Sequence, residues 1–216
     1  MRTIAILSQK GGAGKTTLAL HLAAAGEAAG FVSLVVDMDP QATASKWAEW
    51  RQGVAPEVID SPPALLPRKL AAAEGQGAQL VVIDTPPHAE AAAYEAAKLA
   101  DLILIPCRPR AFDLDAIQMT AALAKRAGKP AFVVFMAGPP NAPKLYAEAA
   151  EVVAGYGIEA APVIFPERAA FHHSTGQGRV AAEFEPAGKA AQDVAALWVW
   201  VSEHVNMSTS KKVRAA

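Results

Sequence analysis

Short apolar runs rich in branched side chains alternate along the chain with longer, alanine-rich stretches. The apolar runs have the length of β-strands, and the stretches between them have the length of helices. We expect strands at residues 3–7, 33–37, 57–59, 80–84, 102–106, 131–136 and 161–164. We expect helices at residues 16–29, 64–74, 89–98, 113–127, 143–156 and 187–204. This alternation predicts a series of βαβ units.

Two of the expected strands are apolar at every central position, which indicates burial on both faces. Residues 80–83 read Leu-Val-Val-Ile, and residues 102–105 read Leu-Ile-Leu-Ile. Such strands are typical of parallel sheets that are covered by helices on both sides. We therefore expect an α/β fold with a doubly wound, mostly parallel sheet. Ligands of such sheets bind beyond the carboxyl ends of the strands.

A glycine-rich loop follows the first expected strand and leads directly into a helix. Backbone N–H groups in a loop of this kind surround the β- and γ-phosphates of a nucleotide, and the helix N-terminus adds partial positive charge. Lys15 would neutralise phosphate charge, and the Thr16 hydroxyl would bind Mg2+. The predicted nucleotide contacts in this loop are Gly11, Gly12, Ala13, Gly14, Lys15, Thr16 and Thr17. The pattern predicts a P-loop NTPase.

Carboxylates follow two of the other expected strands. Asp37 and Asp39 have the alternating spacing that places both on one side of an extended segment, where they can face a phosphate and its metal. Asp84 ends a buried strand at the Walker B position, and we expect it to bind Mg2+ through water. The predicted metal site therefore consists of Thr16, Asp37 and Asp84.

The phosphate loop departs from the general pattern G-x-x-x-x-G-K-[ST], because Gln9 replaces the first glycine and Lys10 follows it. The resulting K-G-G-x-G-K-T-T resembles the deviant Walker A loop of the ParA/MinD superfamily. Three further matches follow in the family's order: D-x-D-P-Q at residues 37–41, D-T-P-P at 84–87 and I-P-x-x-P-x-x-x-D at 105–113. The resemblance covers nearly the whole chain and extends to the small ParA-type partition proteins, which lack an N-terminal DNA-binding extension.

The resemblance implies catalytic roles for Lys10, Lys15 and Asp39. In this family the early lysine, here Lys10, reaches the partner's ATP phosphates in a sandwich homodimer, and the second aspartate, here Asp39, positions the attacking water. Asp37 would be a structural or outer-sphere magnesium partner. Many relatives read adenine with an asparagine near residues 136–138, which here are Met-Ala-Gly. Backbone groups of residues 165–168, Pro166 among them, could form a wall of the adenine pocket instead.

The resemblance also implies a DNA surface in the C-terminal third of the chain. Arg168, Phe171, Ser174, Gly178, Val180 and Glu183 match a family stretch near which basic residues bind DNA without sequence preference. Arg168 is the first candidate for such a contact, followed by Arg179, Lys189 and the cations of residues 206–216. Asp113 is expected to cap the helix that it begins.

Composition bounds these expectations. The net charge is -1, so DNA binding needs a local patch or a dimer, and the single cysteine, Cys107, excludes zinc-ribbon and iron-sulfur sites within one chain. We expect Cys107, Trp47 and Trp50 to pack in the core and His88 to contact solvent. We expect one domain at residues 1–205 and a flexible basic tail at residues 206–216. No apolar run reaches membrane-spanning length and no leader is evident, which predicts a cytoplasmic, nucleoid-associated protein.

The function implied is an ATPase that dimerises on ATP, binds DNA non-specifically and releases it on hydrolysis to ADP and phosphate. A centromere-binding or cargo adaptor protein would stimulate hydrolysis, and the cycle would drive plasmid or chromosome partition. One alternative is the positioning of a protein cargo, such as a chemoreceptor cluster or a microcompartment, on the nucleoid. The other is a MinD-like membrane-surface ATPase, which would need an amphipathic basic C-terminal helix; residues 206–216 have no apolar face.

Overall fold

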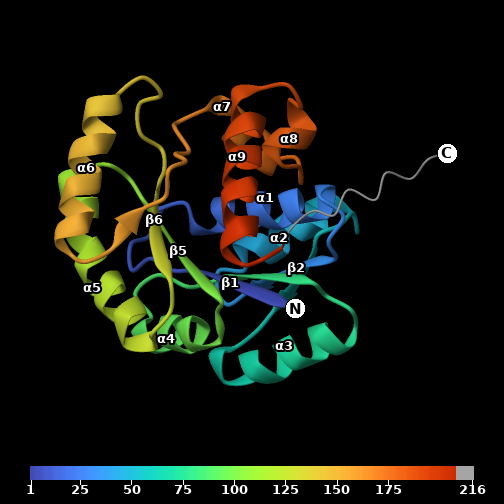
Figure 1. The fold of residues 1–216 in the computed structure, drawn as a ribbon. Helices are drawn as coiled ribbons and strands as arrows, with labels where there is room; N and C mark the ends of the chain where they lie inside the picture. Colours follow the sequence, from blue (N-terminus) through green and yellow to red (C-terminus); the bar gives the residue numbers. More distant parts are fainter. Residues whose placement is uncertain (208–216) are drawn as a thin grey trace.

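The computed structural model describes residues 1–207 and contains a seven-stranded sheet in the order β3-β2-β4-β1-β5-β6-β7 (Figure 1). Every paired strand in it is parallel. The strands are β1 (Arg2–Ile6), β2 (Ser33–Asp37), β3 (Glu57–Asp60), β4 (Leu80–Asp84), β5 (Leu102–Cys107), β6 (Ala131–Phe135) and β7 (Glu159–Ala160). The predicted α/β fold with a parallel sheet is confirmed.

Helices cover both faces of the sheet. They are α1 (Lys15–Ala28), α2 (Thr43–Arg51), α3 (Leu66–Gly75), α4 (Glu90–Leu99), α5 (Ala111–Ala127), α6 (Pro143–Gly155), α7 (Ala169–Thr175), α8 (Ala181–Phe184) and α9 (Lys189–His204), with a 3-10 turn at Pro63–Leu65. One core lies under α1, α2, α7, α8 and α9, and the other lies under α3 to α6. No helix within residues 1–207 combines the length and the apolar character needed to cross a lipid bilayer.

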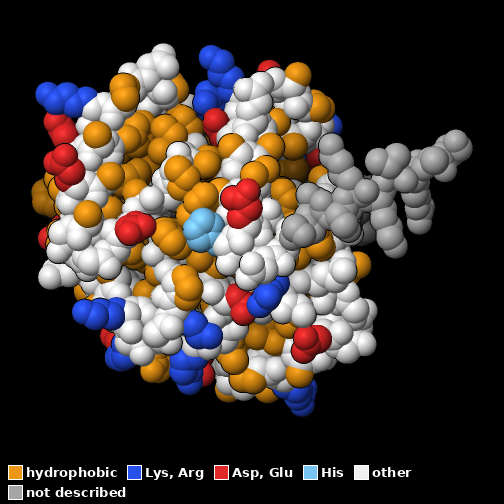
Figure 2. All heavy atoms as spheres, viewed as in Figure 1, with side chains coloured by type: hydrophobic (Ala, Val, Ile, Leu, Met, Phe, Trp, Pro, Cys, Tyr) orange, Lys and Arg blue, Asp and Glu red, His pale blue; other side chains and the backbone are white. Residues whose placement is uncertain are grey.

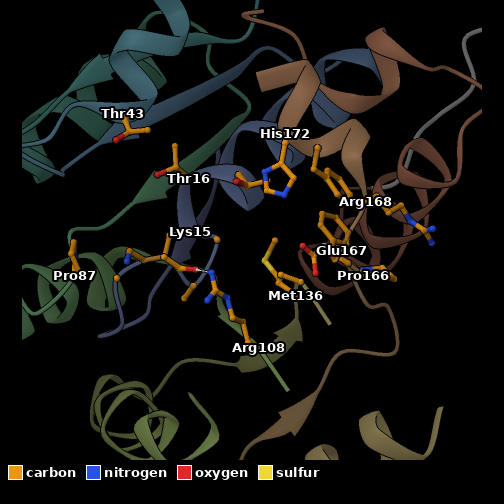
Figure 3. Close-up of a pocket in the computed structure, with 18 of the residues that line it drawn as sticks. Lys15, Thr16, Thr43, Pro87, Arg108, Met136, Pro166, Glu167, Arg168 and His172 are labelled. Carbon is orange, nitrogen blue, oxygen red and sulfur yellow. Dashed lines mark hydrogen bonds between the residues drawn. The ribbon is translucent and has the colours of Figure 1, made fainter. Parts of the chain in front are cut away.

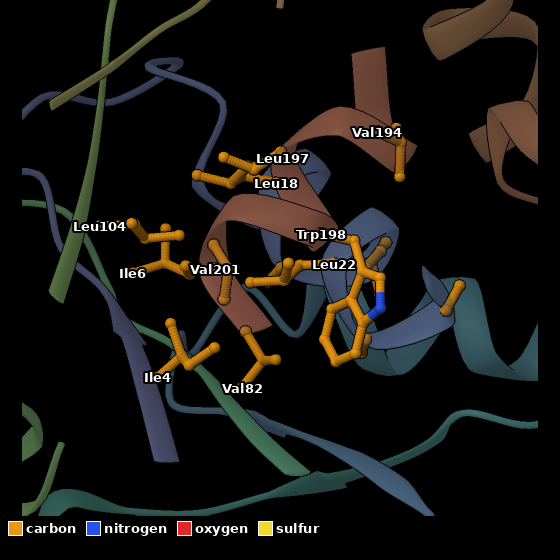
Figure 4. Close-up of a cluster of buried hydrophobic side chains, with 14 of the residues drawn as sticks. Ile4, Ile6, Leu18, Leu22, Val82, Leu104, Val194, Leu197, Trp198 and Val201 are labelled. Carbon is orange, nitrogen blue, oxygen red and sulfur yellow. The ribbon is translucent and has the colours of Figure 1, made fainter. Parts of the chain in front are cut away.

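Alternation along the central strands supplies both cores. Ile4 and Ile6 of β1 point toward α1 and α9, whereas Ala5 points to the opposite face. Figure 4 shows the first of these cores, in which Trp198 of α9 packs beside Leu22 of α1. Each such fully buried side chain contributes about 1.5–3 kcal/mol to folding. This packing holds α1, and therefore the loop that precedes it, against the sheet.

The last strand differs from the prediction. Residues 161–164 do not join a ladder; β7 is the shorter segment Glu159–Ala160, and an isolated bridge pairs Met136 with Phe165. Pro162 lies inside the predicted strand, and a proline cannot donate a ladder hydrogen bond. The ladder is therefore interrupted after Ala160, and the chain rejoins the end of β6 at Phe165, whose backbone N–H donates a hydrogen bond of 2.8 Å to the carbonyl oxygen of Phe135.

Helix boundaries differ from the prediction as well. The helix cap of α5 is Arg110, so Asp113 lies within the first turn and is not the N-cap. The short helices α2, α7 and α8 were not predicted, because their apolar positions are too few to establish a helical period. Cys107 is buried as predicted, and burial raises the pKa of its thiol to about 12. Trp47 is buried, whereas Trp50 is exposed and does not pack in the core.

His21 connects the first helix to the short helix α8. Its Nδ1 lies 2.8 Å from the carbonyl oxygen of Thr17, and its Nε2 accepts a hydrogen bond of 3.0 Å from the backbone N–H of Ala181. Because Nε2 accepts, the proton is on Nδ1 and the ring is neutral. Burial lowers the pKa of His21 to about 4, although the Thr17 carbonyl and the charge of Glu183 act in the opposite direction.

We expect stability to fall in mild acid because of His21. The folded-state pKa of about 4 lies below the ordinary value of 6.5, so the stabilisation is fully present above 6.5 and is lost as the pH falls toward 4. The loss between about pH 8 and about pH 5 should be roughly 2 kcal/mol. Urea unfolding at several pH values measures it. His21→Gln keeps a donor and an acceptor without titrating, so equal pH slopes in both proteins would contradict this assignment.

Candidate nucleotide-binding site

The site lies where the central parallel strands end. The register pairs Asp84 of β4 with Ile6 of β1 on one side and with Asp37 of β2 on the other. The carboxylates are therefore brought next to the loop that leaves β1. A cavity of about 350 Å³ opens at this edge, lined by the loop, by the turn after β2 and by the segment after β7 (Figure 3).

The glycine-rich loop has a backbone that only glycine adopts easily. Gly12 and Gly14 have φ angles of 69° and 98°, in the left-handed region. A Cβ on Gly14 would also lie 3.0 Å from the thioether of Met136. Gly14 precedes the first residue of α1, and no side chain caps this helix. The uncapped N–H groups of α1 therefore border the cavity, which suits a bound anion.

The two loop lysines occupy different environments. Lys15 is buried, and its ammonium donates a hydrogen bond of 3.2 Å to the carbonyl oxygen of Lys10. Burial lowers the pKa of Lys15, and the charges of Asp84 and Asp39 oppose this effect. Lys10 is half-exposed, and its Nζ lies 3.7 Å from a carboxylate oxygen of Asp113. Lys15 therefore lines the cavity, whereas Lys10 lies outside its lining and is directed at Asp113 at the start of α5.

Asp84 and Thr16 form a pair suited to Mg2+. The Thr16 hydroxyl donates a hydrogen bond of 2.6 Å to Oδ2 of Asp84, while the buried Oδ1 has no partner. The pKa of Asp84 is raised to about 7, mainly by burial; the hydrogen bond from Thr16 and the charge of Lys15 act in the opposite direction, whereas the charges of Asp37 and Asp39 add to the increase. An orphaned carboxylate oxygen beside a hydroxyl is the kind of donor set that Mg2+ completes with water and phosphate oxygens.

Asp37 and Asp39 have distinct positions. The buried Asp37 carboxylate accepts hydrogen bonds from the backbone of Asp39 and from both the backbone and the hydroxyl of Ser45, all at 3.0–3.2 Å. It thereby orders the turn after β2 and the start of α2. Asp39 lines the cavity and accepts a bond of 2.9 Å from the backbone of Gln41. Within residues 1–207 no cluster of three or more His, Cys, Asp or Glu side chains could hold a metal by itself.

Apolar side chains line part of the cavity, as a flat nucleotide base would require. Met136, Phe165 and Pro166 are among them, and Phe165 stacks on Phe171 with ring centroids 5.3 Å apart. The predicted Pro166 therefore borders the cavity. The other residues of the predicted segment, Phe165, Glu167 and Arg168, line it as well, whereas Thr43, Pro87, Arg108 and His172 were not predicted from the sequence. In the sequence these residues stand out only because they follow a strand or lie beside a matched motif position.

The helix that follows the first carboxylate turn is tied to the C-terminal third of the chain. The indole N–H of Trp47 donates to the carbonyl oxygen of Arg179 at 3.2 Å. The buried guanidinium of Arg51 forms an ion pair with the carboxylate of Glu183 and donates a hydrogen bond of 3.0 Å to the carbonyl oxygen of Gly178. Burial by itself would raise the pKa of Glu183. The hydrogen bond from Arg51 and smaller effects nearby outweigh burial, so the pKa is lowered. These contacts connect α2 to the segment that carries the predicted DNA cations.

The three predicted DNA residues lie in different settings. Arg168 borders the nucleotide cavity and forms an ion pair with Asp193, with 2.6 Å between Nε and Oδ2 and 20% exposure for each side chain. Arg179 and Lys189 are exposed. On the face shown in Figure 2, lysine and arginine side chains are mixed with aspartate and glutamate. The predicted cations Lys211, Lys212 and Arg214, with most of the predicted tail, lie outside the described residues.

A parallel sheet with a phosphate loop after β1 and a carboxylate at the end of β4 defines a P-loop nucleotide-binding protein. Residues 4–179 match the family described as the CobQ/CobB/MinD/ParA nucleotide binding domain. The chain belongs to this family, as the sequence motifs predicted.

Comparison with individual proteins gives the same family assignment. The chain is 45% identical over 115 residues to the maintenance of carboxysome distribution protein A of Gloeobacter kilaueensis, across 52% of each protein. It therefore spans about half the length of this curated relative. The fold is similar to MinD of Pyrococcus horikoshii OT3 complexed with Mg-ADP, with a TM-score of 0.76 and 19% identity across 97% of this chain and 99% of that one. A Cyanothece McdA variant in complex with ATP has a TM-score of 0.68 and 18% identity across 96% and 97% of the two chains.

Asp84→Asn should remove most of the effect of Mg2+ on nucleotide binding. The amide keeps the bond from Thr16 but loses the charge that Mg2+ needs, so the roughly tenfold or larger gain in ATP affinity with Mg2+ should disappear. Titration calorimetry with Mg2+ and with EDTA measures this. The metal-free variant should be no less stable than the parent protein, because a buried charge is removed. An undiminished Mg2+ effect in a folded variant would disprove the metal assignment.

Proposed function

We propose that the protein is a ParA-type ATPase that hydrolyses ATP to ADP and phosphate, dimerises on ATP and uses DNA as the surface on which it positions a cargo. The observation that carries this proposal is the phosphate loop with two lysines, Lys15 buried in the cavity and Lys10 half-exposed outside the cavity lining. A half-exposed lysine beside the cavity could leave its ion pair with Asp113 and reach a second subunit. This placement fits the sandwich homodimer that the resemblance implies.

The roles of the side chains follow from their positions. The loop N–H groups, the N-terminus of α1 and Lys15 bind the phosphates, and Thr16 and Asp84 would hold Mg2+, which neutralises charge on the phosphates. Asp39 lies at the cavity wall and positions the attacking water. Asp37 keeps the turn that carries Asp39 in place through its bonds to the backbone. Phosphoryl transfer depends mainly on such positioning and charge stabilisation.

A protein cargo is favoured over a plasmid. The observation behind this choice is the 45% identity to a protein that maintains carboxysome distribution. The relevant adaptor would then be a protein of the cargo and not a centromere-binding protein. Plasmid or chromosome partition is the second candidate, because the phosphate loop and both carboxylate motifs match ParA-type proteins equally well.

The DNA surface is placed at the C-terminal third of the chain. Arg179 and Lys189 are exposed there, and Arg179 lies one residue from Gly178, which contacts the helix after the Asp39 turn. Arg168 would have to leave Asp193 before it could bind a DNA phosphate. We therefore assign the first contacts to Arg179 and Lys189, doubled in a dimer. Non-specific contacts to DNA would hold the protein at the nucleoid in the cytoplasm.

Asp39→Ala should trap an ATP-bound dimer that hydrolyses ATP about a hundredfold more slowly, because the group that positions the water is lost. Phosphate release measures turnover, and light scattering during size-exclusion chromatography measures the dimer. Asp60→Ala is the matched control, since Asp60 is an exposed aspartate at the end of the neighbouring strand β3. Unchanged turnover in the Asp39 variant would rule out its role.

DNA binding should require ATP, weaken with salt and ignore sequence. The test is binding to a random-sequence labelled duplex with ATP, ADP or no nucleotide, at two salt concentrations. Arg179→Ala and Lys189→Ala should each lower affinity uniformly across sequences and reduce the salt slope by about one, with ATPase activity intact. Lys144→Ala, at an exposed lysine of α6, serves as the control. If no nucleotide state binds DNA, the proposed surface is wrong and vesicle co-sedimentation tests the membrane alternative.

A further inference from the structure

Arg108 contacts the phosphate loop from the neighbouring strand. It follows β5 directly, and its Nη2 donates a hydrogen bond of 2.7 Å to the carbonyl oxygen of Gly12. Arg108 also lines the nucleotide cavity, and Figure 3 shows its side chain directed toward the loop beside Lys15. The resemblance assigned no role to this position, which is variable in the matched pattern I-P-x-x-P-x-x-x-D.

The contact controls the orientation of one loop peptide. In a trans peptide the N–H of Ala13 points opposite to the carbonyl of Gly12. Gly12 has a φ of 69°, and as a glycine it has several accessible backbone conformations. The guanidinium therefore determines in which direction the Ala13 N–H points. A loop that binds phosphates through its N–H groups depends on such an orientation.

The charge of Arg108 is also available to an anion. Two arginines line the cavity, and Arg168 is neutralised by the carboxylate of Asp193. Arg108 has no carboxylate within 4.0 Å among residues 1–207. A guanidinium has five N–H donors, of which the bond to Gly12 uses one. Arg108 thus brings to the cavity a positive charge that forms no ion pair with a carboxylate of residues 1–207, although Asp39 and Glu167 line the same cavity.

We propose that Arg108 is a positioning residue for the nucleotide phosphates. It holds the Gly12 peptide in the binding orientation and adds positive charge at the cavity mouth. Both effects strengthen phosphate binding, and the charge effect grows with the number of phosphate charges. ATP therefore gains more from Arg108 than ADP does.

The test compares Arg108→Gln with Arg108→Lys and Arg110→Gln. We expect Arg108→Gln to raise the Kd for Mg-ATP about tenfold, and the Kd for ADP by less, without a change in Tm. Arg108→Lys keeps the charge and one donor, so it should recover part of the ATP affinity. Arg110 is an exposed arginine two residues further along, and Arg110→Gln should bind both nucleotides as the parent protein does.

The outcomes separate this inference from a structural role and from the proposed function. An unchanged Kd for ATP in Arg108→Gln overturns the inference. Equal losses for ATP and ADP with a lowered Tm and no recovery in Arg108→Lys overturn it as well, because they mean that Arg108 only supports the fold. The measurement uses nucleotide binding alone, so a failure of DNA binding or cargo positioning leaves it unaffected.

Discussion

The register of three central strands is the constraint on which the site depends. Because β4 pairs with β1 on one side and β2 on the other, Asp84 lies level with both Ile6 and Asp37. A shift of one residue in β4 would turn Asp84 to the other face and exchange Val82 of one core with Val81 and Ile83 of the other. The apolar side chains that alternate along these strands therefore specify the position of the metal and phosphate groups at the same time. Packing and chemistry are encoded by the same residues.

The site places charges where the rest of the fold would not tolerate them. Lys15 and Asp84 are both buried. Burial lowers the pKa of Lys15 and raises the pKa of Asp84, so it favours the neutral form of each side chain. Part of this unfavourable energy is offset by the attraction between them and by the bond from Thr16. In the proposed function, a nucleotide with Mg2+ would supply the remaining opposite charges. The buried charges of Lys15 and Asp84 are thus only partly compensated by the protein, and a ligand that compensates them would gain binding energy.

Much of this arrangement could be predicted from the sequence, because it depends on local patterns. The loop glycines, the paired lysines and the carboxylates that end strands are short motifs, and apolar runs identified the six longer strands. Other features depend on tertiary contacts. The pairing of Arg168 with Asp193 joins residues 25 positions apart, and the contact of Arg108 with Gly12 joins residues 96 positions apart. The early end of the last strand depended on a single proline, Pro162, inside an otherwise suitable apolar run.

The ties between α2 and the C-terminal third give the nucleotide site a physical route to the proposed DNA surface. A Cβ on Gly178 would lie 2.5 Å from the backbone of Trp50, so the two segments are in direct contact. The bidentate pair of Arg51 with Glu183 is reinforced by the bonds from Arg51 to backbone carbonyls. Such a well-satisfied polar contact resists gradual deformation. Any movement of the Asp39 turn that displaces α2 must therefore either break this contact or move residues 178–183 with it, and Arg179 lies within that segment.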